Sequence, residues 1–320
     1  DISTLFLPLN YLSPSSFNIA LDLRTIVSLS PWEKGSIKVS SKGFETAVFK
    51  KETPPFNHPM GLMFAVAKYF DAHGVHIHIE SASPPRSALG GSSSAAVALV
   101  AAFHKVLDIP IHPEQIAWLA HYIEASVAGV PCGMQDQLAA AFGGVNQWVW
   151  KMGKISPEFE RRPVFENEDD MKAFNSKMLI AYCGIPHVSK DINKQWVDSF
   201  VRGETRLAFE KIADLTKEFS RAVKNQSFRQ AADLMNQETK LRLKMTPDVL
   251  DKAGKKLFEK AVDCDCGARF TGAGGGGCLW AVGEVQDIEI LTPFWQDILE
   301  AVKDAKILDT KIENKGIIIV

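Results

Sequence analysis

A loop of small residues separates a strand pattern from an apolar helix pattern between positions 83 and 95. Side chains of this size let a ligand approach the backbone closely, and the first turn of a helix presents unpaired N–H groups that favour an anion. We therefore predict a phosphate site built from Pro85, Ser87, Leu89, Gly90, Gly91, Ser92, Ser93 and Ser94. The alternatives are a flexible serine-rich linker and a serine that only caps the helix. The loop is not a Walker A motif, because it lacks Gly-Lys-Ser/Thr.

Two carboxylates lie on neighbouring helix patterns. Glu124 stands near the end of one helix, and Asp136 stands twelve positions later in the first turn of the next. A tight turn at 129–133 can bring both carboxylates to one cleft, where hard oxygen ligands suit Mg²⁺ and the helix N-terminus keeps Asp136 ionised. The alternative is that both are solvated charges on helix surfaces, as most carboxylates are.

A second loop, Thr271 to Gly277, contains five glycines between two short strand patterns. A connection of this kind is too tight for a spacer. Its backbone amides can bind an anion, or its lack of side chains can simply let another segment pack closely.

A polar turn follows the strand pattern at 178–182. Gly184 and Pro186 fix the turn, and His187, Ser189 and Lys190 then bring hydrogen-bond donors to the start of a helix. Such a helix start favours an anion, so we predict that His187 and Lys190 contact a phosphate group on the substrate. The alternative is an ordinary capped helix.

The surrounding elements mix strands and helices without strict βαβ alternation, which favours two α+β domains over a doubly wound sheet. The acid-rich stretch 151–176 has no clear period. We therefore expect a boundary there, with domains at 1–170 and 171–320. A last strand is expected at Gly316 to Val320.

Composition argues against several partners. The 320 residues carry 36 Lys and Arg against 38 Asp and Glu, a net charge of −2. This charge predicts no binding to nucleic acid or to an anionic membrane. The longest apolar run, Ala95 to Phe103, is far shorter than the roughly 20 residues of a membrane helix. Five cysteines without a zinc-binding spacing favour a reducing, cytoplasmic compartment.

Taken in order, these motifs resemble those of the GHMP kinases, which include galactokinase, homoserine kinase, mevalonate kinase and phosphomevalonate kinase. Pro84 to Ala95 is similar to the family's second motif, Pro-x-x-x-Gly-Leu-Gly-Ser-Ser-Ala, and Thr271 to Gly277 matches the third. Ala88 replaces a usual glycine, and Gly91 falls where the family often has its first serine. The stretch 134–144 looks most like the bacterial branch that phosphorylates heptose 7-phosphate or fucose at the anomeric position.

This resemblance implies a ribosomal-S5-like N-terminal domain and a ferredoxin-like C-terminal domain with ATP bound between them. It implies that Glu124 binds magnesium and that Asp136 is the catalytic carboxylate. The magnesium-binding hydroxyl falls by register on Ser92, with Ser93 as the alternative one residue later. The glycine loop would support the nucleotide phosphates through Gly274 and Gly275, or the substrate through Gly272. Most of the first motif is missing, and Asp1 looks like the aspartate that closes it and binds sugar hydroxyls.

We therefore expect an ATP- and Mg²⁺-dependent kinase that transfers the γ-phosphoryl group to a sugar hydroxyl. The expected substrate is a small sugar or sugar phosphate, foremost a heptose 7-phosphate-like molecule phosphorylated at its anomeric hydroxyl. Asp1, Asn18 and Gln137 are candidates for hydrogen bonds to the sugar, on position alone. The alternatives are a galactokinase or fucokinase acting on a free sugar, a mevalonate-type alcohol kinase, and a non-catalytic sugar sensor.

Overall fold

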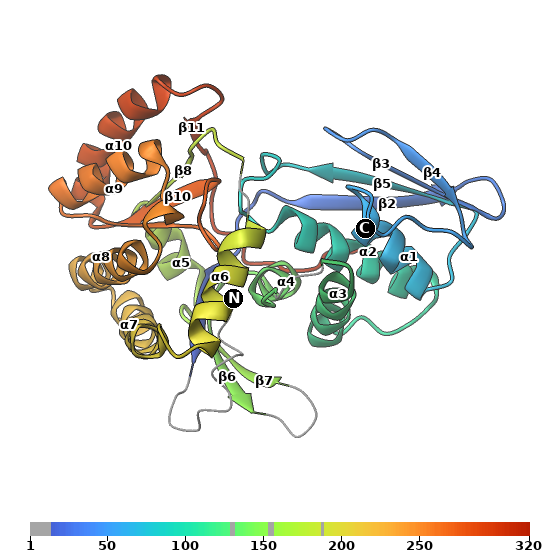
Figure 1. The fold of residues 1–320 in the computed structure, drawn as a ribbon, viewed down its shortest axis with the longest axis horizontal. Helices are drawn as coiled ribbons and strands as arrows, with labels where there is room; N and C mark the ends of the chain where they lie inside the picture. The colour runs from blue at the N-terminus through green and yellow to red at the C-terminus, as the bar shows by residue number, and fades with distance from the viewer. Residues whose placement is uncertain (1–13, 129–131, 153–156, 187–188) are drawn as a thin grey trace. The chain divides into compact units, whose positions relative to one another are not determined.

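The computed structural model describes residues 14–128, 132–152, 157–186 and 189–320; the side chains of 152, 157 and 189–191 are also outside the description. The chain forms two compact units, each assembled from several segments (Figure 1). The first, which we call the carboxylate unit, contains residues 20–85, 90–143 and 313–320. The second, the glycine-loop unit, contains residues 1–19, 86–89 and 144–312. The expected domains, 1–170 and 171–320, are two continuous stretches, whereas each unit combines separate stretches of the chain. The expected division stays a prediction about which parts fold independently.

The carboxylate unit is a four-stranded sheet with helices packed on one face (Figure 1). The strand order is β2-β5-β3-β4, and β3 and β5 are parallel whereas the other pairs are antiparallel. Ile37, Val39, Ile77 and Ile79 are buried on the helix side, which explains the period-two pattern of these strands. The elements are β2 (Thr25–Pro31), β3 (Ser36–Ser41), β4 (Ala47–Lys50), α1 (Gly61–Tyr69), β5 (Val75–Ser81), α2 (Gly91–Val106), α3 (Pro113–Ala128) and α4 (Gln135–Phe142).

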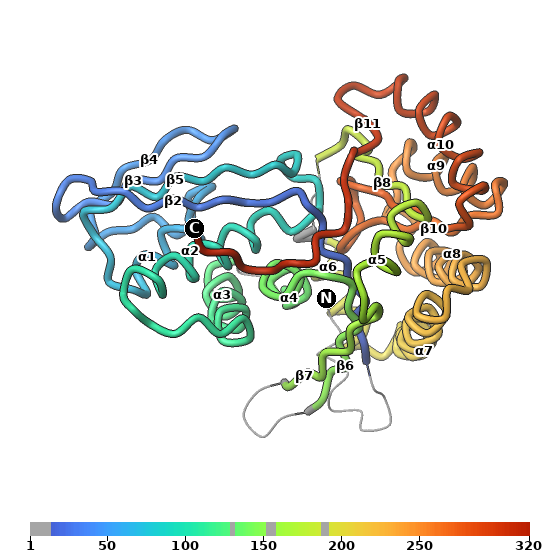
Figure 2. The backbone as a smooth tube through the Cα atoms, turned by 180° about the vertical axis from the view of Figure 1, so that it is seen from behind, coloured from blue at the N-terminus to red at the C-terminus, as the bar shows by residue number. Residues whose placement is uncertain are grey.

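The expected strand at 316–320 is wrong. This segment has no strand conformation and runs beside the end of α4, where the amide of Ile317 donates to the carbonyl of Ala141 at 3.3 Å (Figure 2). The guanidinium of Arg24 donates to the carbonyls of Lys315 and Gly316 at 2.8 and 3.1 Å. Arg24 also forms an ion pair with Glu313 at 2.9 Å. Because the Arg24 side chain satisfies the backbone carbonyls of Lys315 and Gly316, the segment is fixed in place without pairing to a strand.

The glycine-loop unit contains two sheets. One has the order β1-β6-β7 and is antiparallel throughout, and the other has the antiparallel order β11-β8-β10-β9. Its elements are β1 (Ser15–Ile19), β6 (Val145–Met152), β7 (Pro157–Pro163), α5 (Glu168–Asn175), β8 (Met178–Tyr182), α6 (Ser189–Val201), α7 (Arg206–Lys224), α8 (Phe228–Met245), the 3₁₀ turn η2 (Pro247–Val249), α9 (Lys252–Asp263), β9 (Gly267–Phe270), β10 (Cys278–Val282), α10 (Val285–Glu300) and β11 (Lys306–Ile307).

Strand β9 lies at the edge of its sheet, and polar side chains of α8 cover that edge. The carboxamide of Asn236 donates to the carbonyl of Cys266 at 3.0 Å and accepts from the amide of Ala268 at 3.1 Å. The hydroxyl of Thr239 donates to the carbonyl of Ala268 at 2.8 Å. A Cβ at Gly267 would lie 2.5 Å from the carbonyl oxygen of Ala232, so glycine is required for this close approach of helix to strand.

The acid-rich stretch 151–176, expected to be an irregular boundary, is largely ordered. Residues 157–163 form β7 by pairing with β6, and 168–175 form α5. Asn167 caps this helix, because its side chain accepts from the amide of Asp170 at 2.8 Å, and three acidic residues occupy the first turn. Met171 and Phe174 are the buried side of a helix that is otherwise polar, which is why the period was weak in the sequence.

Across the described stretches, every helix is too short or too polar to cross a lipid bilayer.

Candidate active site

Three helices of the carboxylate unit meet around Glu124. The Ser93 hydroxyl, in the first turn of α2, donates to Glu124 Oε2 at 2.8 Å. The Gln137 side-chain nitrogen, in the first turn of α4, donates to the same oxygen at 2.6 Å. Ser93 and Gln137 are buried. A carboxylate that accepts two hydrogen bonds at one oxygen is fixed in orientation, so Glu124 is not a solvated helix charge.

Asp136 lies against the backbone of the phosphate loop. Gly90 adopts the left-handed conformation at φ 67° and precedes the first turn of α2. A Cβ on Gly90 would lie 2.8 Å from Cβ and 2.9 Å from Cγ of Asp136, distances that no real side chain tolerates. Glycine is therefore required here both by the backbone conformation and by the carboxylate beside it. The predicted cleft residues Asp136, Glu124 and the loop do come together.

Both carboxyl groups prefer their neutral form more than usual. Burial raises the pKa of Glu124, and the charge of Asp136 raises it further, although the hydrogen bonds from Ser93 and Gln137 oppose this. Burial likewise raises the pKa of Asp136. Two partly buried carboxylates that repel each other would be stabilised in their ionised form by a cation. The candidate metal ligands in this cluster are oxygen atoms of Glu124, Asp136 and Ser93. Oxygen is the ligand type that Mg²⁺ prefers, so these residues fit the metal that the family resemblance implies.

The register of the serine loop favours the later hydroxyl. Ser93 is buried and its hydroxyl donates to Glu124, whereas Ser92 is exposed. The register of the family's second motif favours Ser92 as the metal-binding hydroxyl, with Ser93 as the alternative. Both assignments stay predictions, and the geometry supports Ser93.

The first half of the phosphate loop, residues 86–89, packs against the glycine loop inside the glycine-loop unit. Arg86 and Ala88 have positive φ angles of 55° and 59°. Ala88 therefore occupies the left-handed conformation in which the family usually has glycine. A Cβ on Gly277 would lie 2.7 Å from the Ala88 methyl carbon and 2.7 Å from the Ser87 carbonyl oxygen. The methyl group of Ala88 thus takes space that only a glycine at 277 leaves open.

This packing gives a stability prediction. Gly277→Ala should lower the free energy of unfolding by at least about 1–3 kcal/mol, because it combines a strained φ with a steric clash. Gly35→Ala is the matched control, since Gly35 has a similar φ of 82° but open space around it. Urea unfolding should therefore show a larger loss at 277 than at 35. Adding Ala88→Gly should recover part of the difference; equal losses at both positions would show that the contact is unimportant.

The amides of the glycine loop divide into two groups. Those of Gly274, Gly275 and Gly277 donate to the carbonyls of Thr271 (3.3 Å), Val249 (2.9 Å) and Ile185 (2.8 Å). Within the described ranges, no acceptor is recorded for the amides of Gly272, Ala273 and Gly276. These three amides are the ones in the loop that the described part of the protein leaves without an acceptor, and of the three residues Gly272 and Gly276 are partly exposed whereas Ala273 is buried. That Gly274 and Gly275 contact the nucleotide stays a prediction. Their amides already donate to protein carbonyls, so such a contact would not use these amides.

The predicted sugar-binding residues are spread over the chain. Gln137 holds Glu124, a role that the sequence did not suggest, and its buried Oε1 has no partner among the described residues. Asn18 lies on β1 and Gly272 lies in the glycine loop, and both belong to the glycine-loop unit. Asp1 and His187 fall outside the described residues, as does the side chain of Lys190. Their roles stay predictions.

The chain is similar in sequence and fold to known kinases. Residues 57–144 match the model of the GHMP kinases N terminal domain. A mevalonate kinase of Pyrococcus abyssi is 28% identical over 300 residues, which cover 85% of this chain and 83% of that protein. A D-glycero-alpha-D-manno-heptose 7-phosphate kinase of Campylobacter jejuni is 24% identical over 210 residues, 64% of this chain and 60% of that protein. The crystal structure of Lactococcus lactis galactokinase complexed with galactose gives a TM-score of 0.75 at 18% identity, covering 96% of this chain and 89% of that one.

Fold and matches together define a phosphotransferase whose acceptor is an alcohol group. Residues 57–144 match a GHMP kinases N-terminal domain, and the proteins that the chain resembles over 64–96% of its length are kinases of mevalonate or of a sugar. The expected family and the α+β fold of that family are confirmed.

Proposed function

We propose that the protein uses ATP and Mg²⁺ to phosphorylate a hydroxyl group of a sugar, with a heptose 7-phosphate-like substrate as the first candidate. The observation that carries the proposal is the cluster of Glu124, Ser93, Gln137, Asp136 and Gly90, in which two carboxylates lie beside the N-terminus of a helix and a glycine of the phosphate loop. Phosphoryl transfer needs placement and charge neutralisation, and this cluster supplies groups for both.

Each residue has a distinct role in this proposal. Glu124 and a serine hydroxyl, Ser93 or Ser92, would hold the metal ion, which when bound would supply positive charge against the phosphates. Gln137 keeps the Glu124 carboxylate in place. Asp136 orients the substrate hydroxyl and accepts its proton as the new O–P bond forms. The raised pKa of Asp136 makes it a stronger base than an exposed aspartate, which suits this role.

The second candidate is a mevalonate-type kinase. It is favoured by the similarity to the Pyrococcus mevalonate kinase, which extends over 85% of this chain, against 64% for the heptose 7-phosphate kinase. The polar triplet Gln135-Asp136-Gln137 favours a polyhydroxylated substrate instead, because a sugar needs several paired hydrogen-bonding groups. The two candidates share the proposed chemistry and differ only in the acceptor.

ADP release over a panel of acceptors tests the proposal. The panel contains D-glycero-D-manno-heptose 7-phosphate, galactose, fucose, mannose and mevalonate, each with ATP and Mg²⁺. A sugar should give the highest kcat/KM. Mevalonate as the best acceptor would replace the sugar proposal with the second candidate. ATP binding without turnover on any acceptor would favour a non-catalytic sensor.

A phosphate already on the sugar should improve the substrate strongly. The helix that begins at Ser189 follows His187, and a helix start with Lys190 nearby favours an anion. Heptose 7-phosphate should therefore be used at least about 10-fold better than free heptose, one charged hydrogen bond being worth about 1.5–3 kcal/mol. His187→Ala combined with Lys190→Ala should remove this preference and leave the KM for ATP unchanged. Equal use of both sugars by the unaltered protein would favour a galactokinase- or fucokinase-like activity.

A further inference from the structure

The glycine loop, residues 271–277, depends on its surroundings for its conformation. All five of its glycines have positive φ angles, between 59° and 104°. Glycine adopts such angles at little cost but also has no preference for them over others. A loop of this composition keeps one conformation only if neighbouring segments fix it, and two chains of contacts reach it from α8.

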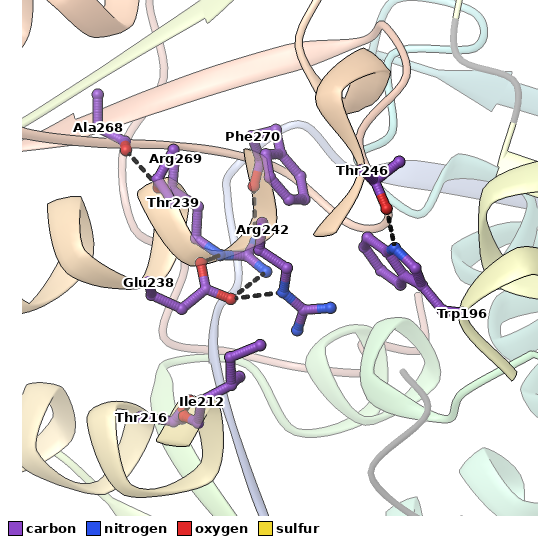
Figure 3. A network of polar contacts seen from close by, with 10 residues as sticks. All are labelled: Trp196, Ile212, Thr216, Glu238, Thr239, Arg242, Thr246, Ala268, Arg269 and Phe270. Atoms are coloured by element: carbon purple, nitrogen blue, oxygen red, sulfur yellow. Dashed lines mark hydrogen bonds and ion pairs between the residues drawn. The ribbon is translucent and has the colours of Figure 1, made fainter. Parts of the chain in front are cut away.

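Glu238 of α8 is the point from which both chains start (Figure 3). Its carboxylate is buried and accepts from Arg242 Nε at 2.8 Å and from Arg269 Nε at 2.9 Å. Burial alone would raise its pKa, but the charges and hydrogen bonds of Arg269 and Arg242 together lower the pKa to about 2. Glu238 is therefore ionised at every pH at which the protein would be assayed.

The first chain of contacts runs through Arg269 to the start of the loop. Arg269 lies on β9, and its Nη1 donates to the carbonyl of Phe270 at 2.6 Å (Figure 3). Phe270 directly precedes Thr271, the first residue of the loop. Glu238 holds the guanidinium through Nε and Nη2, at 2.9 and 3.4 Å, so the position of the carbonyl is tied to the helix.

The second chain of contacts runs through Arg242 to the middle of the loop. The Arg242 guanidinium lies over the ring of Trp196, 4.4 Å from its centre, and Trp196 Nε1 donates to the Thr246 hydroxyl at 2.8 Å. Thr246 begins the turn η2, whose last residue, Val249, accepts from the amide of Gly275 at 2.9 Å.

The two chains of contacts reach Phe270 and Val249, and both of these residues lie close to Gly274. A Cβ on Gly274 would lie 2.5 Å from a methyl carbon of Val249 and 2.9 Å from a ring carbon of Phe270. The loop is thus enclosed between the residue that ends the first chain and the residue that ends the second. Among the described residues, Glu238 is the carboxylate that pairs with each of the two arginines.

We propose that Glu238 is a positioning residue of the kinase reaction. By holding Arg269 and Arg242 together it fixes the glycine loop at its start and at its centre. This keeps the loop in the conformation that leaves the amides of Gly272, Ala273 and Gly276 available to a phosphate group. The assignment of that phosphate to ATP rests on the proposed function, whereas the fixing of the loop does not.

The test compares Glu238→Gln with Glu284→Gln. Glu284 also forms an ion pair in this unit, with Lys177 at 2.8 Å. It is a suitable control because it follows the C-terminal end of β10, whereas the glycine loop precedes the N-terminal end of that strand. Glu238→Gln should raise the KM for ATP by about 10–10²-fold, the usual effect of a small misplacement of a binding group. It should also speed amide hydrogen exchange in peptides that cover 267–280. Glu284→Gln should change neither quantity.

Two results would overturn the proposal. One is a folded Glu238→Gln protein with normal exchange of the loop and a normal KM for ATP. If that variant does not fold, Arg269→Lys is measured in its place, because lysine keeps the charge but loses the paired guanidinium contacts. The second result is normal exchange of the loop and a normal KM for ATP in the Arg269→Lys protein. A wild-type protein without kinase activity would reject the proposed function alone, since the exchange comparison requires no turnover.

Discussion

Asp136→Asn should lower kcat by about 10²–10⁴-fold, the usual contribution of a general base. Asparagine keeps the volume of the side chain beside Gly90 but has neither the charge nor the ability to accept a proton. The fold of α4 and the phosphate loop should persist, so the affinity for ATP should change little. Steady-state kinetics with the best acceptor measure the first effect, and equilibrium binding of a non-hydrolysable ATP analogue measures the second.

Asp169→Asn provides the matched control for this substitution. Asp169 also lies in the first turn of a helix, α5, and its side chain is almost fully exposed. The same chemical change there should leave kcat unaltered. Near-normal turnover in the Asp136→Asn protein would remove Asp136 from the reaction, and a large loss of ATP affinity would show that it serves binding instead.

Glu124→Gln should increase the Mg²⁺ concentration required for half-maximal activity by at least about 10-fold. Substitutions of residues that only support a metal ligand already lower metal affinity by about 10–100-fold. A neutral amide is a poor ligand for a hard cation, so raising Mg²⁺ should restore part of the activity. The measurement is a magnesium titration at saturating ATP. Glu114→Gln, at the exposed start of the same helix, is the control and should behave as wild type.

The same substitution should stabilise the protein in the absence of metal. A carboxyl with a raised folded-state pKa is protonated in both states below its usual value of 4.5, and above that value the unfolded state ionises more readily. Stability is therefore lost as pH rises from 4.5 through the raised pKa, and the neutral amide of the Glu124→Gln protein avoids this loss. A higher Tm at pH 7.5 without Mg²⁺ would separate a metal defect from a folding defect. A lower Tm together with an unchanged magnesium requirement would return Glu124 to a structural role.

The parts of the site that could be predicted are those written into short stretches of sequence. The phosphate loop combines a strand pattern, small residues and an apolar helix within about two dozen positions, and local spacing decides all three. Glu124 and Asp136 could be brought together because only a short stretch of sequence, 129–134, separates their helices. The register of the serines could not be decided in the same way. One residue corresponds to a rotation of about 100° around a helix, and only the packing of α2 against α3 shows that the Ser93 hydroxyl donates to Glu124.

Other features depend on segments that are distant in sequence. Glu238 and Arg242 of α8 are buried although they are charged, because β9, about thirty residues later, supplies Arg269. The hydrophobic end of the chain, 317–320, has the composition of a strand. It forms none, because a strand needs a partner edge and this segment meets Arg24 and the end of α4 instead. Neither partner could be identified from periodicity.

The segment 313–320 also sets the order in which the protein is completed during translation. It belongs to the unit whose other parts end at residue 143, and it supplies the partners of Ala20, Arg24 and Ala141. About 170 residues lie in between, which at roughly 5–20 residues per second corresponds to about 10–30 s of synthesis. During this interval the sheet and its helices would lack their final closing contacts on the ribosome. The unit that carries the two carboxylates therefore cannot be completed until residues 144–312 of the other unit have been synthesised.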